Sequence, residues 1–449
     1  MTDNPPSIAA TLADSAGFLP PDDPLRATLH NEVHARPPAR VQLPGLIVQV
    51  AVLNAGIGRE QEWGHLRLLT GQAQLPLERL QGNFLRLPCG NHTVKWERHT
   101  EFTRYSIVQA LPGQAVLGAV EPELLSGLAV MPDWLRSIPG RTVAAVQLAM
   151  VEGVLTDELA LMRQAQAWFG DRAVIASQLG HGHSWAVTDF QIGADGFERM
   201  LVIAAPGTTE TRAGRISQRL LELEIYRLMA LRGLPVAKQL APMLAKAESA
   251  LADITAQLEN KSASDQELLD TLVSLATRVE RATAEHSYRF SATRAYDTLV
   301  GQRLSELREK PIPGTQTLGE FMQRRLSPAI ATVAATAQRL SSLSERVTRT
   351  SALLRTRVDI ATEAQNQLLL EKLTRGQELQ LRLQSTVEGL SIAAICYYVI
   401  SLLLYGGKAA KAAGAPINPE ILAGALIPLV LWLVWRNIRR IHAKLQGRG

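Results

Sequence analysis

Two uncharged apolar stretches near the C-terminus constrain this chain more than any other feature. The first, Gly389–Gly407, has nineteen residues without a charge, and the second, Ile421–Trp435, has fifteen. A helix of nineteen residues, rising about 1.5 Å per residue, spans a hydrocarbon core about 30 Å thick. Tyr405 and Trp435 have side chains typical of interfacial aromatic belts. The stretches predict a transmembrane helical hairpin; the alternative is a pair of buried core helices in a soluble protein.

The basic residues around these stretches predict their orientation, because positive charge concentrates on the cytoplasmic side of membrane proteins. The loop between the stretches carries only Lys408 and Lys411. Both chain ends are therefore expected in the cytoplasm, with the hairpin in the inner membrane and in contact with its lipid. The opposing basic residues are Lys372, Arg375 and Arg382 before the first stretch, and Arg436, Arg439, Arg440, Lys444 and Arg448 after the second.

Composition narrows the class of protein further. The formal net charge is +5, and much of the excess lies in the last fourteen residues instead of on a basic face interleaved with aromatics, so we expect no nucleic acid partner. The two cysteines, Cys89 and Cys396, are too few for a disulfide framework and are typical of a reducing compartment. Residues Met1–Pro6 lack the basic and apolar segments of a signal peptide, so the first domain is expected in the cytoplasm.

Residues 1–205 have the pattern of a mixed α/β domain. Short runs rich in Val, Ile and aromatic residues predict strands, and amphipathic stretches between them predict helices. The predicted strands are Leu46–Leu53, Asn83–Pro88, Phe102–Val108, Thr142–Val151, Ala173–Gln178, Ser184–Ile192 and Arg199–Ala204, and the predicted helices are Glu60–Leu69, Pro122–Arg136 and Thr156–Phe169.

From residue 206 to the first apolar stretch the pattern is almost wholly helical. Ser264 with Glu267, and Thr317 with Glu320, have the spacing of N-terminal capping boxes. Pro328 is expected to kink the last helical section. The sections run over about 209–259, 264–310 and from 317 onward. The fold class expected is α+β, with a cytoplasmic α/β domain (1–205), a helical stalk (206–388), a transmembrane hairpin (389–436) and a basic cytoplasmic tail (437–449).

The third helical section carries the clearest periodic signal. Its apolar and small residues alternate spacings of four and three, as in the seam of a coiled coil. Many positions hold Ala, Ser or Gln, which favours a weak or multi-helix contact over a strong dimeric zipper. The partners are the two preceding helical sections, other copies of the chain in a homo-oligomer, or both. The seam is Leu326, Ile330, Val333, Ala337, Leu340, Ser344, Val347, Ser351, Leu354, Val358, Ala361, Gln365 and Leu368.

Several segments resemble a known family. LHNEVHARPP at 29–38, KWERHTEF at 95–102 and TDFQIGADGFERMLV at 188–202 are similar to a bacterial family called domain of unknown function 3422, whose members are described as membrane-anchored. The resemblance implies a membrane protein organised as a single unit, and the family brings no established activity. Further similar segments are IPGTQTLGEFMQRRLSPA at 312–329, RVDIATEAQNQLLL at 357–370 and LQLRLQSTVEGLS at 379–391.

The order of the predicted parts also resembles CorA-type divalent-cation channels, which form pentameric rings in which the first span lines the pore. The sequence departs from that family directly after the first span. The Gly-Met-Asn signature is absent, and the matching place reads Tyr405-Gly406-Gly407-Lys408. A lysine at a pore entrance repels a divalent cation. The resemblance therefore implies a layout, and it assigns no selectivity filter.

His30, Glu32 and His34 form the most suggestive cluster of candidate ligands. In an extended segment, residues two apart share a face, so the three side chains point to one divalent metal ion. The alternative, which we favour, is that they tie an N-terminal arm to the domain by hydrogen bonds and ion pairs.

Two further sets of residues are candidates for a polar or metal site. Alternation places Lys95, Glu97, His99 and Glu101 on one face of a strand, where Glu97 and His99 form a possible general base or ion site. A solvated strand face with cross-strand salt bridges is the more common arrangement.

His181 and His183, within Leu-Gly-His-Gly-His-Ser, have a spacing that chelates metals in loops. A glycine-rich turn with a chance histidine pair is the alternative.

The first apolar stretch has a stripe of small and polar residues that includes Ser391, Tyr398, Ser401 and Tyr405. Such a stripe either packs against another helix or lines a narrow pore, and packing is the more common. Neither stretch holds a charged residue, which disfavours proton-coupled transport.

Two functions compete on these observations. The first is an oligomeric cation channel or transporter of CorA-like layout with a cytoplasmic sensing domain. The second is a membrane-tethered sensor or scaffold whose hairpin is only an anchor. No P-loop, nucleophile elbow, zincin or dinucleotide motif is present, so the sequence offers no support for an enzyme. A membrane-bound metalloenzyme is a third and weaker hypothesis.

Overall fold

The computed structural model describes residues 22–446 except 28, 31–39, 70–74, 81, 261–262, 415 and 417, and over 438–446 it describes the backbone alone. The chain divides into two compact units. The first comprises the residues up to Asn260 together with Thr271–Arg349, and the second comprises Lys261–Asp270 and Thr350–Gly449.

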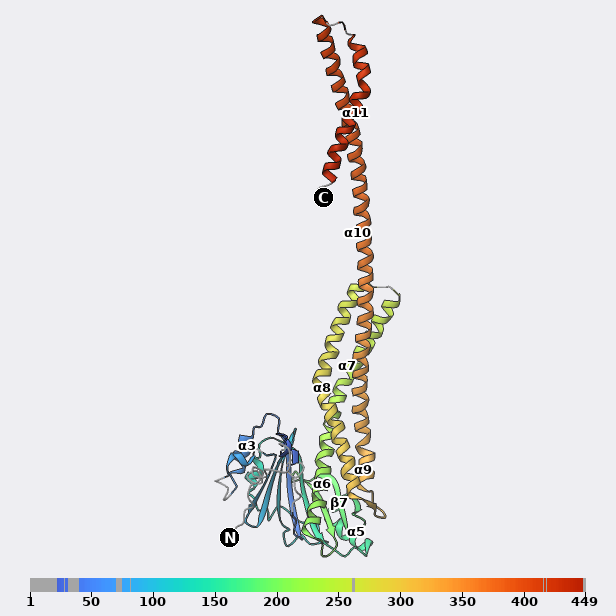
Figure 1. Ribbon diagram of the computed structural model, residues 1–449. Helices are drawn as coiled ribbons and strands as arrows, with labels where there is room; N and C mark the ends of the chain where they lie inside the picture. The colour runs from blue at the N-terminus through green and yellow to red at the C-terminus, as the bar shows by residue number, and fades with distance from the viewer. Residues whose placement is uncertain are drawn as a thin grey trace. The chain divides into compact units, whose positions relative to one another are not determined.

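The first unit is built on a nine-stranded mixed sheet, and the fold is therefore α+β as predicted (Figure 1). The strand order is β2-β3-β4-β1-β5-β8-β7-β6-β9. Neighbouring strands pair antiparallel except β5 and β8, which are parallel. The strands are β1 (Gly45–Leu53), β2 (Phe84–Cys89), β3 (His92–Arg98), β4 (Phe102–Ala110), β5 (Arg141–Glu152), β6 (Ile175–Leu179), β7 (Ser184–Ile192), β8 (Glu198–Ala204) and β9 (Lys310–Pro311).

Helices cover both faces of this sheet, which explains why the central strands are apolar on both sides. Leu46 and Val48 of β1 belong to a core that includes Leu66 of α3 and Trp168, which follows α5. Ile47, on the opposite face, belongs to a second core with α6, α9 and the end of α8. Because side chains alternate along a strand, continuous apolar runs are expected where both faces are buried.

The helices of the two units follow from local signals in the sequence. Thr317 and Glu320 form the predicted capping box at the start of α9, and the Ser264 hydroxyl accepts the Glu267 amide N–H at 3.2 Å before α8. The helices are α3 (Arg59–Leu66), η2 (Leu77–Leu80), α4 (Pro132–Arg136), α5 (Glu158–Ala167), α6 (Glu210–Leu231), α7 (Gly233–Asn260), α8 (Asp265–Leu307), α9 (Leu318–Arg325), α10 (Ser327–Ala412) and α11 (Pro419–Gln446).

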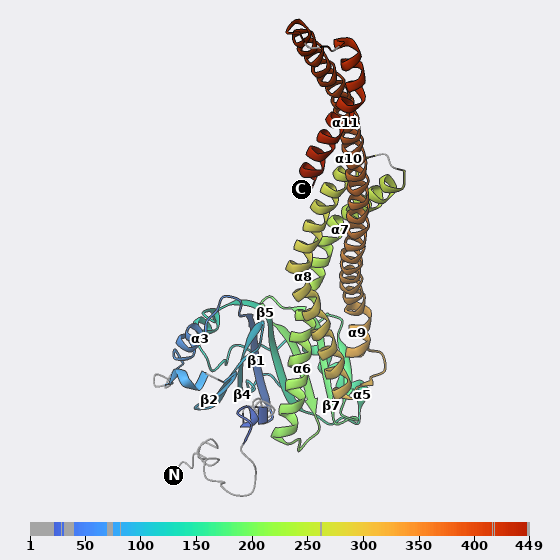
Figure 2. The ribbon, with the colours of Figure 1, turned by 45° about the horizontal axis from the view of Figure 1, so that its top comes forward.

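In the first unit, α7, α8 and the beginning of α10 lie side by side (Figure 2). The seam predicted for α10 is buried at Val333, Leu340 and Val347. An ion pair between Arg339 Nη2 of α10 and Glu248 Oε2 of α7, 2.7 Å apart, flanks this contact. The preceding helical sections are therefore partners of the seam, as one of the predicted arrangements requires.

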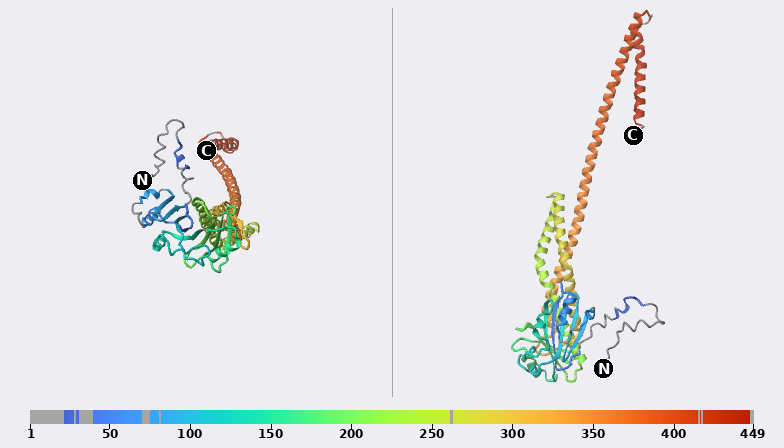
Figure 3. Two further views of the ribbon diagram at one scale, coloured as in Figure 1. Left: turned by 90° about the horizontal axis from the view of Figure 1, so that it is seen from below. Right: turned by 90° about the vertical axis from the view of Figure 1, so that its left-hand side faces the viewer.

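In the second unit, α11 turns back along the end of α10 (Figure 3). Cys396 and Gly407 of α10 are buried, as are Ala423 and Val430 of α11. Most of the other large apolar side chains of the two helices are exposed. By length and composition, two segments are apolar enough to cross a membrane, Leu318–Ala412 and Pro419–Asn437.

Two sequence predictions are corrected. The helix predicted over Pro122–Arg136 is confined to Pro132–Arg136, because Pro122, Gly127 and Pro132 interrupt the pattern. Strand β3 had been indicated only by the alternation in KWERHTEF, and it ends at Arg98, before His99 and Glu101. Strand β9 had not been predicted, because it is a two-residue strand at the sheet edge.

Candidate functional site

A row of polar side chains crosses the face of the sheet that α6 covers. The register opposes Lys95 of β3 to Ser106 of β4, and Ser106 to Gln49 of β1. One pair along, Glu97 opposes Arg104. All five side chains are buried, with Glu97 only 1% exposed and Lys95 only 5%. Since residues two apart share one face of a strand, this polar row follows directly from the pairing of β3 with β4.

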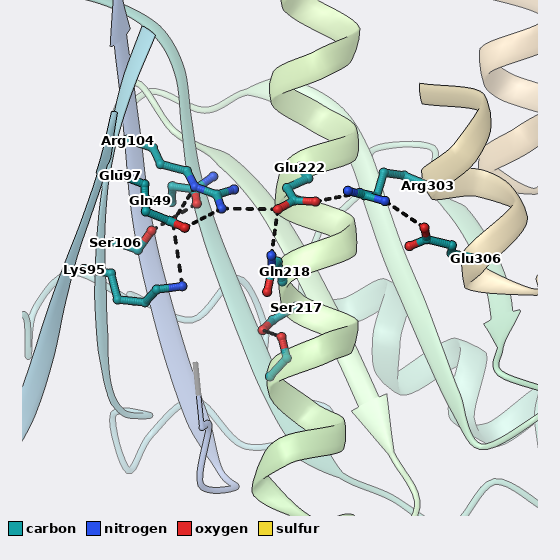
Figure 4. A network of polar contacts seen from close by, with 11 residues as sticks. Gln49, Lys95, Glu97, Arg104, Ser106, Ser217, Gln218, Glu222, Arg303 and Glu306 are labelled. Carbon is teal, nitrogen blue, oxygen red and sulfur yellow. Dashed lines mark hydrogen bonds and ion pairs between the residues drawn. The ribbon is translucent and has the colours of Figure 1, made fainter. Parts of the chain in front are cut away.

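The row continues through α6 to α8 as a chain of alternating charges (Figure 4). Arg104 Nη2 donates to Glu97 Oε1 at 2.8 Å and to Glu222 Oε1 of α6 at 3.2 Å. Arg303 Nε of α8 donates to Glu222 Oε2 at 2.6 Å, and Arg303 Nη1 donates to Glu306 Oε1 at 2.8 Å. We call these five residues the charge relay. It links the sheet to two helices that are distant in the sequence.

The charges within the relay support one another electrostatically. Burial raises the pKa of Glu97, but the neighbouring cations Arg104 and Lys95 and the hydrogen bond from Arg104 together lower it to about 2. Burial likewise raises the pKa of Glu222, and Arg104, Gln218 and Arg303 lower it below its ordinary value. Both carboxylates are therefore ionised near neutral pH, which a buried acid achieves only beside positive charge.

Lys95 has the most unusual environment in the row. Burial lowers its pKa, and the attraction of Glu97, whose Oε2 lies 3.7 Å from Nζ, opposes that effect. A lysine in such surroundings is a candidate base or nucleophile. The cavity beside it, also lined by Gln49 and Ser217, has a volume of about 20 Å³. That space holds about one water molecule, so this cavity beside Lys95 is too small for a substrate.

A second buried cluster joins β8 to α6. Glu198 and Glu224 share one guanidinium, that of Arg227, whose Nη2 lies 3.2 Å from Glu198 Oε1 and whose Nε donates to Glu224 Oε2 at 2.8 Å. Burial and the neighbouring Glu224 raise the pKa of Glu198 well above its ordinary value. Glu198 therefore keeps its proton at neutral pH.

Of the second predicted set, the structure brings only Lys95 and Glu97 into the row. His99 lies in the turn after β3 and stacks on Phe102, with ring centroids 4.4 Å apart. Glu101 Oε1 pairs with Arg289 Nη1 of α8 at 2.7 Å. The expected cross-strand salt bridge is present as Glu97–Arg104. It is buried, whereas the sequence-based alternative placed such salt bridges on a solvated strand face.

The histidine candidates lie at two different places. His181 and His183 stand in the turn between β6 and β7, and His181 Nε2 is 3.3 Å from Arg308 Nη1. His30 lies in a short helical turn, while Glu32 and His34 lie outside the described residues. Within the described part of the chain, no three His, Cys, Asp or Glu side chains are grouped so as to hold a metal ion.

Most of the small and polar stripe of α10 is exposed. Tyr398 and Tyr405 are 67% and 68% exposed, Ser391 is exposed and Ser401 is half-buried. The Ser391 hydroxyl donates to the Val387 carbonyl within the helix. The exposed residues of this stripe are therefore available to a helix of another chain, and both packing and pore lining stay predictions.

Sequence reasoning missed Arg104, Glu222 and Arg303, the centre of the relay. A signal was present in part, since Arg104 interrupts the apolar FTRYSIV run of β4, and Glu222 and Glu224 interrupt LLELEI of α6. A charge inside an apolar run indicates a buried partner, but no local pattern says which one.

Comparison with known proteins adds one match. The model of a family described as protein of unknown function (DUF3422) matches residues 21–445. No curated protein and no solved structure matches the chain significantly, so the likeness to CorA-type channels gains no support from comparison.

Proposed function

The chain belongs to the DUF3422 family, and we propose that it is an integral membrane protein anchored by the α10–α11 helix pair, with the α+β unit in the cytoplasm as a ligand-responsive sensor. The proposed boundaries are those of the sequence: the α/β domain (1–205), the helical stalk (206–388), the hairpin (389–436) and the basic tail (437–449).

The low burial of the two apolar helices carries this proposal. Only 6% of the most apolar 18-residue window in α10 is buried, and 17% of that in α11. The core helices of a soluble protein would bury most of such a window. Exposed side chains such as Leu402 and Leu429 need an apolar surrounding, and a bilayer supplies it around both helices at once.

The continuity of α10 supports a role that couples the domain to the anchor. The helix packs against α7 and α8 at its beginning and runs without interruption to Ala412. The charge relay ties α8 and α6 to the sheet. A displacement of the sheet therefore acts on the same helix bundle from which α10 emerges.

Self-association is part of the proposal. From Ile360 to Leu390, the large apolar side chains of α10 are exposed, among them Leu369 and Leu383. Leu369 and Leu383 follow the last residue of the predicted seam, Leu368, which is itself exposed. A second copy of the chain offers a matching apolar stripe, and closed symmetric homo-oligomers are the usual form of such contacts.

The small and polar stripe in the first apolar stretch of α10 favours a second candidate function, an oligomeric cation channel. Ser391, Tyr398 and Tyr405 would face a common axis if several copies assembled around α10. Lys408, whose Nζ lies 5.9 Å from the ring centre of Tyr405, places a positive charge at one end of that stripe. That charge disfavours divalent cations, so the sensor anchored by a hairpin is the better-supported function.

Alkaline carbonate extraction of cell membranes tests the anchor. The wild-type chain should stay in the pellet, and Leu402→Arg with Leu429→Arg should move it into the supernatant, since each arginine costs about 2.5–3.5 kcal/mol at the centre of a spanning helix. Leu159→Arg, at an exposed leucine of α5, is the matched control and should leave extraction unchanged. Recovery of the wild-type chain in the supernatant would refute the proposal.

A reporter fused after Gly449 should read as cytoplasmic.

A further inference from the structure

An open pocket lies where the β6–β7 turn meets the first turns of α6 and the end of α8. Its volume is about 360 Å³, which is within the roughly 300–1,000 Å³ of small-molecule sites. The turn, the helix and the residue after α8 each supply basic side chains. These are His181, His183, Arg212, Arg215, Arg219 and Arg308, which we call the basic pocket.

Positive charge in the basic pocket is not balanced. Glu306 is the one acidic side chain among the described lining residues. Its Oε2 lies 3.1 Å from Arg219 Nε, and its Oε1 accepts from Arg303, so both oxygens are engaged. Arg212 and Arg215 have no ion pair with any described residue of the chain. The pocket therefore has an excess of cations that a bound anion would neutralise.

The placement of the arginines on α6 makes this excess unfavourable in the empty pocket. Arg212, Arg215 and Arg219 are spaced three and four apart, so they lie on one face of the helix. Like charges at such spacings repel each other. An anion that binds between these side chains removes the repulsion, and this gain contributes to the free energy of binding.

The wall opposite α6 is held in place by contacts between the turn and the end of α8. The Gly180 amide donates to the Leu307 carbonyl at 2.9 Å, and Arg308 Nη1 donates to His181 Nε2 at 3.3 Å. His181 and Arg308 both have positive φ, 64° and 49°. Non-glycine residues adopt that conformation at a cost, and such strain persists where surrounding contacts fix it. The pocket is thus largely formed before a ligand arrives.

We propose that the basic pocket binds the phosphate group of a small anion. Several guanidinium groups around one hollow fit the oxygens of phosphate, which they bind in bidentate fashion. A multiply charged anion matches the three arginines better than a single carboxylate does. The same arginines repel a divalent cation, so the metal site considered for His181 and His183 is disfavoured. This inference goes beyond the proposed function, because the pocket lies within the first unit and needs no membrane.

Calorimetric titration of pyrophosphate into the full-length protein in non-ionic detergent tests the proposal. The buffer should contain about 0.15 M salt, since that shortens the range of non-specific surface attraction to about 8 Å. Wild-type protein should show saturable binding. The double variant Arg212→Gln with Arg215→Gln should bind at least tenfold more weakly, and its folding should be unchanged because neither arginine forms an ion pair within the described part of the chain.

A matched control removes the same charge elsewhere. Arg86→Gln with Arg163→Gln changes two exposed arginines, on β2 and α5, and should leave the affinity unchanged. Saturable binding that survives Arg212→Gln with Arg215→Gln would overturn the proposal, as would equal weakening in the control variant or an absence of saturable wild-type binding at millimolar pyrophosphate.

The source of the phosphate is distinguished by competition. A short-chain phosphatidic acid below its micellar concentration presents the same chemical group as a lipid headgroup. If it displaces pyrophosphate and binds more tightly, the pocket takes a lipid headgroup. If pyrophosphate binds more tightly, the pocket takes a free phosphate compound.

Discussion

At the scale of single residues, Arg104 supplies the positive charge that stabilises two buried carboxylates in the core. Its guanidinium is the contact shared by Glu97 and Glu222, both buried and ionised. Buried charges are stable only when paired, and removal of one partner leaves the other uncompensated.

Arg104→Met should therefore destabilise the first unit by about 3–5 kcal/mol, the usual loss when a buried ion pair loses one partner. Denaturant unfolding of the solubilised protein, followed by near-ultraviolet circular dichroism, measures this. Arg136→Met removes an exposed pair with Asp133 and should cost about 0–1 kcal/mol. Equal effects of the two variants would show that the relay does not stabilise the fold.

Glu198 should make the free energy of unfolding decrease as the pH rises. Because burial and Glu224 raise its pKa, the folded chain keeps a proton that the unfolded chain releases. That contribution is fully present below the ordinary pKa of a glutamate and is lost as pH rises through the folded value. Wild-type stability should therefore fall from pH 5 towards pH 9.

Glu198→Gln keeps a neutral hydrogen-bonding side chain at every pH and should abolish much of this fall. The variant should match the wild type in thermal unfolding at pH 5 and exceed it at pH 8. Glu60→Gln, at an exposed position of α3, is the control and should retain the wild-type pH profile. A parallel decline in Glu198→Gln would mean that another group carries the proton.

At the scale of secondary-structure elements, the bundle of α7, α8 and α10 depends on close approach at the start of α7. A β-carbon at Gly233 would lie 2.4 Å from Thr293 Oγ1 of α8 and 3.2 Å from Val333 Cγ1 of α10. The Thr293 hydroxyl in turn donates to the Ala230 carbonyl at 3.1 Å. Glycine at this position allows three helices to meet.

Gly233→Ala should thus destabilise the first unit by about 1–3 kcal/mol, the usual cost of overpacking. Gly301→Ala is the matched control within α8, where a β-carbon meets nothing within 4 Å. It should stabilise by about 0.5–1 kcal/mol, because alanine is the better helix former. Thermal unfolding of both variants distinguishes the two effects, and opposite signs are expected.

At the scale of the whole molecule, self-association distinguishes the two candidate functions, because a channel requires several copies around one axis. Light scattering after size exclusion in detergent should report a mass of several copies, because the apolar stripe from Ile360 to Leu390 is exposed in a single copy. Leu369→Glu with Leu383→Glu should reduce that mass. Leu159→Glu, outside the stripe, should not. A ring of several copies would justify ion-flux assays, and a monomer would remove both the oligomer and the channel from consideration.

The sequence by itself determined the features that repeat locally. Seven strands, the capping box at Thr317 and the seam of α10 were predicted because each has a signal within a few residues, alternation for strands and spacings of three and four for helices. The seam is buried at positions up to Leu354, whereas its last residue, Leu368, is exposed. The two apolar stretches were visible for the same reason. Whether they cross a membrane stays a proposal.

The tertiary structure alone decided which distant residues meet. Arg104 and Glu222 are 118 positions apart, and the strand order places β9 beside β6 after three long helices. The boundary predicted at residue 205 follows the change of pattern, yet α6 packs on the sheet that precedes it. The basic pocket likewise takes its arginines from α6 and from the end of α8. Charged residues have no period along the chain, so their partners are set by strand pairing and helix packing, and the sequence lists the charges without saying which of them are neighbours.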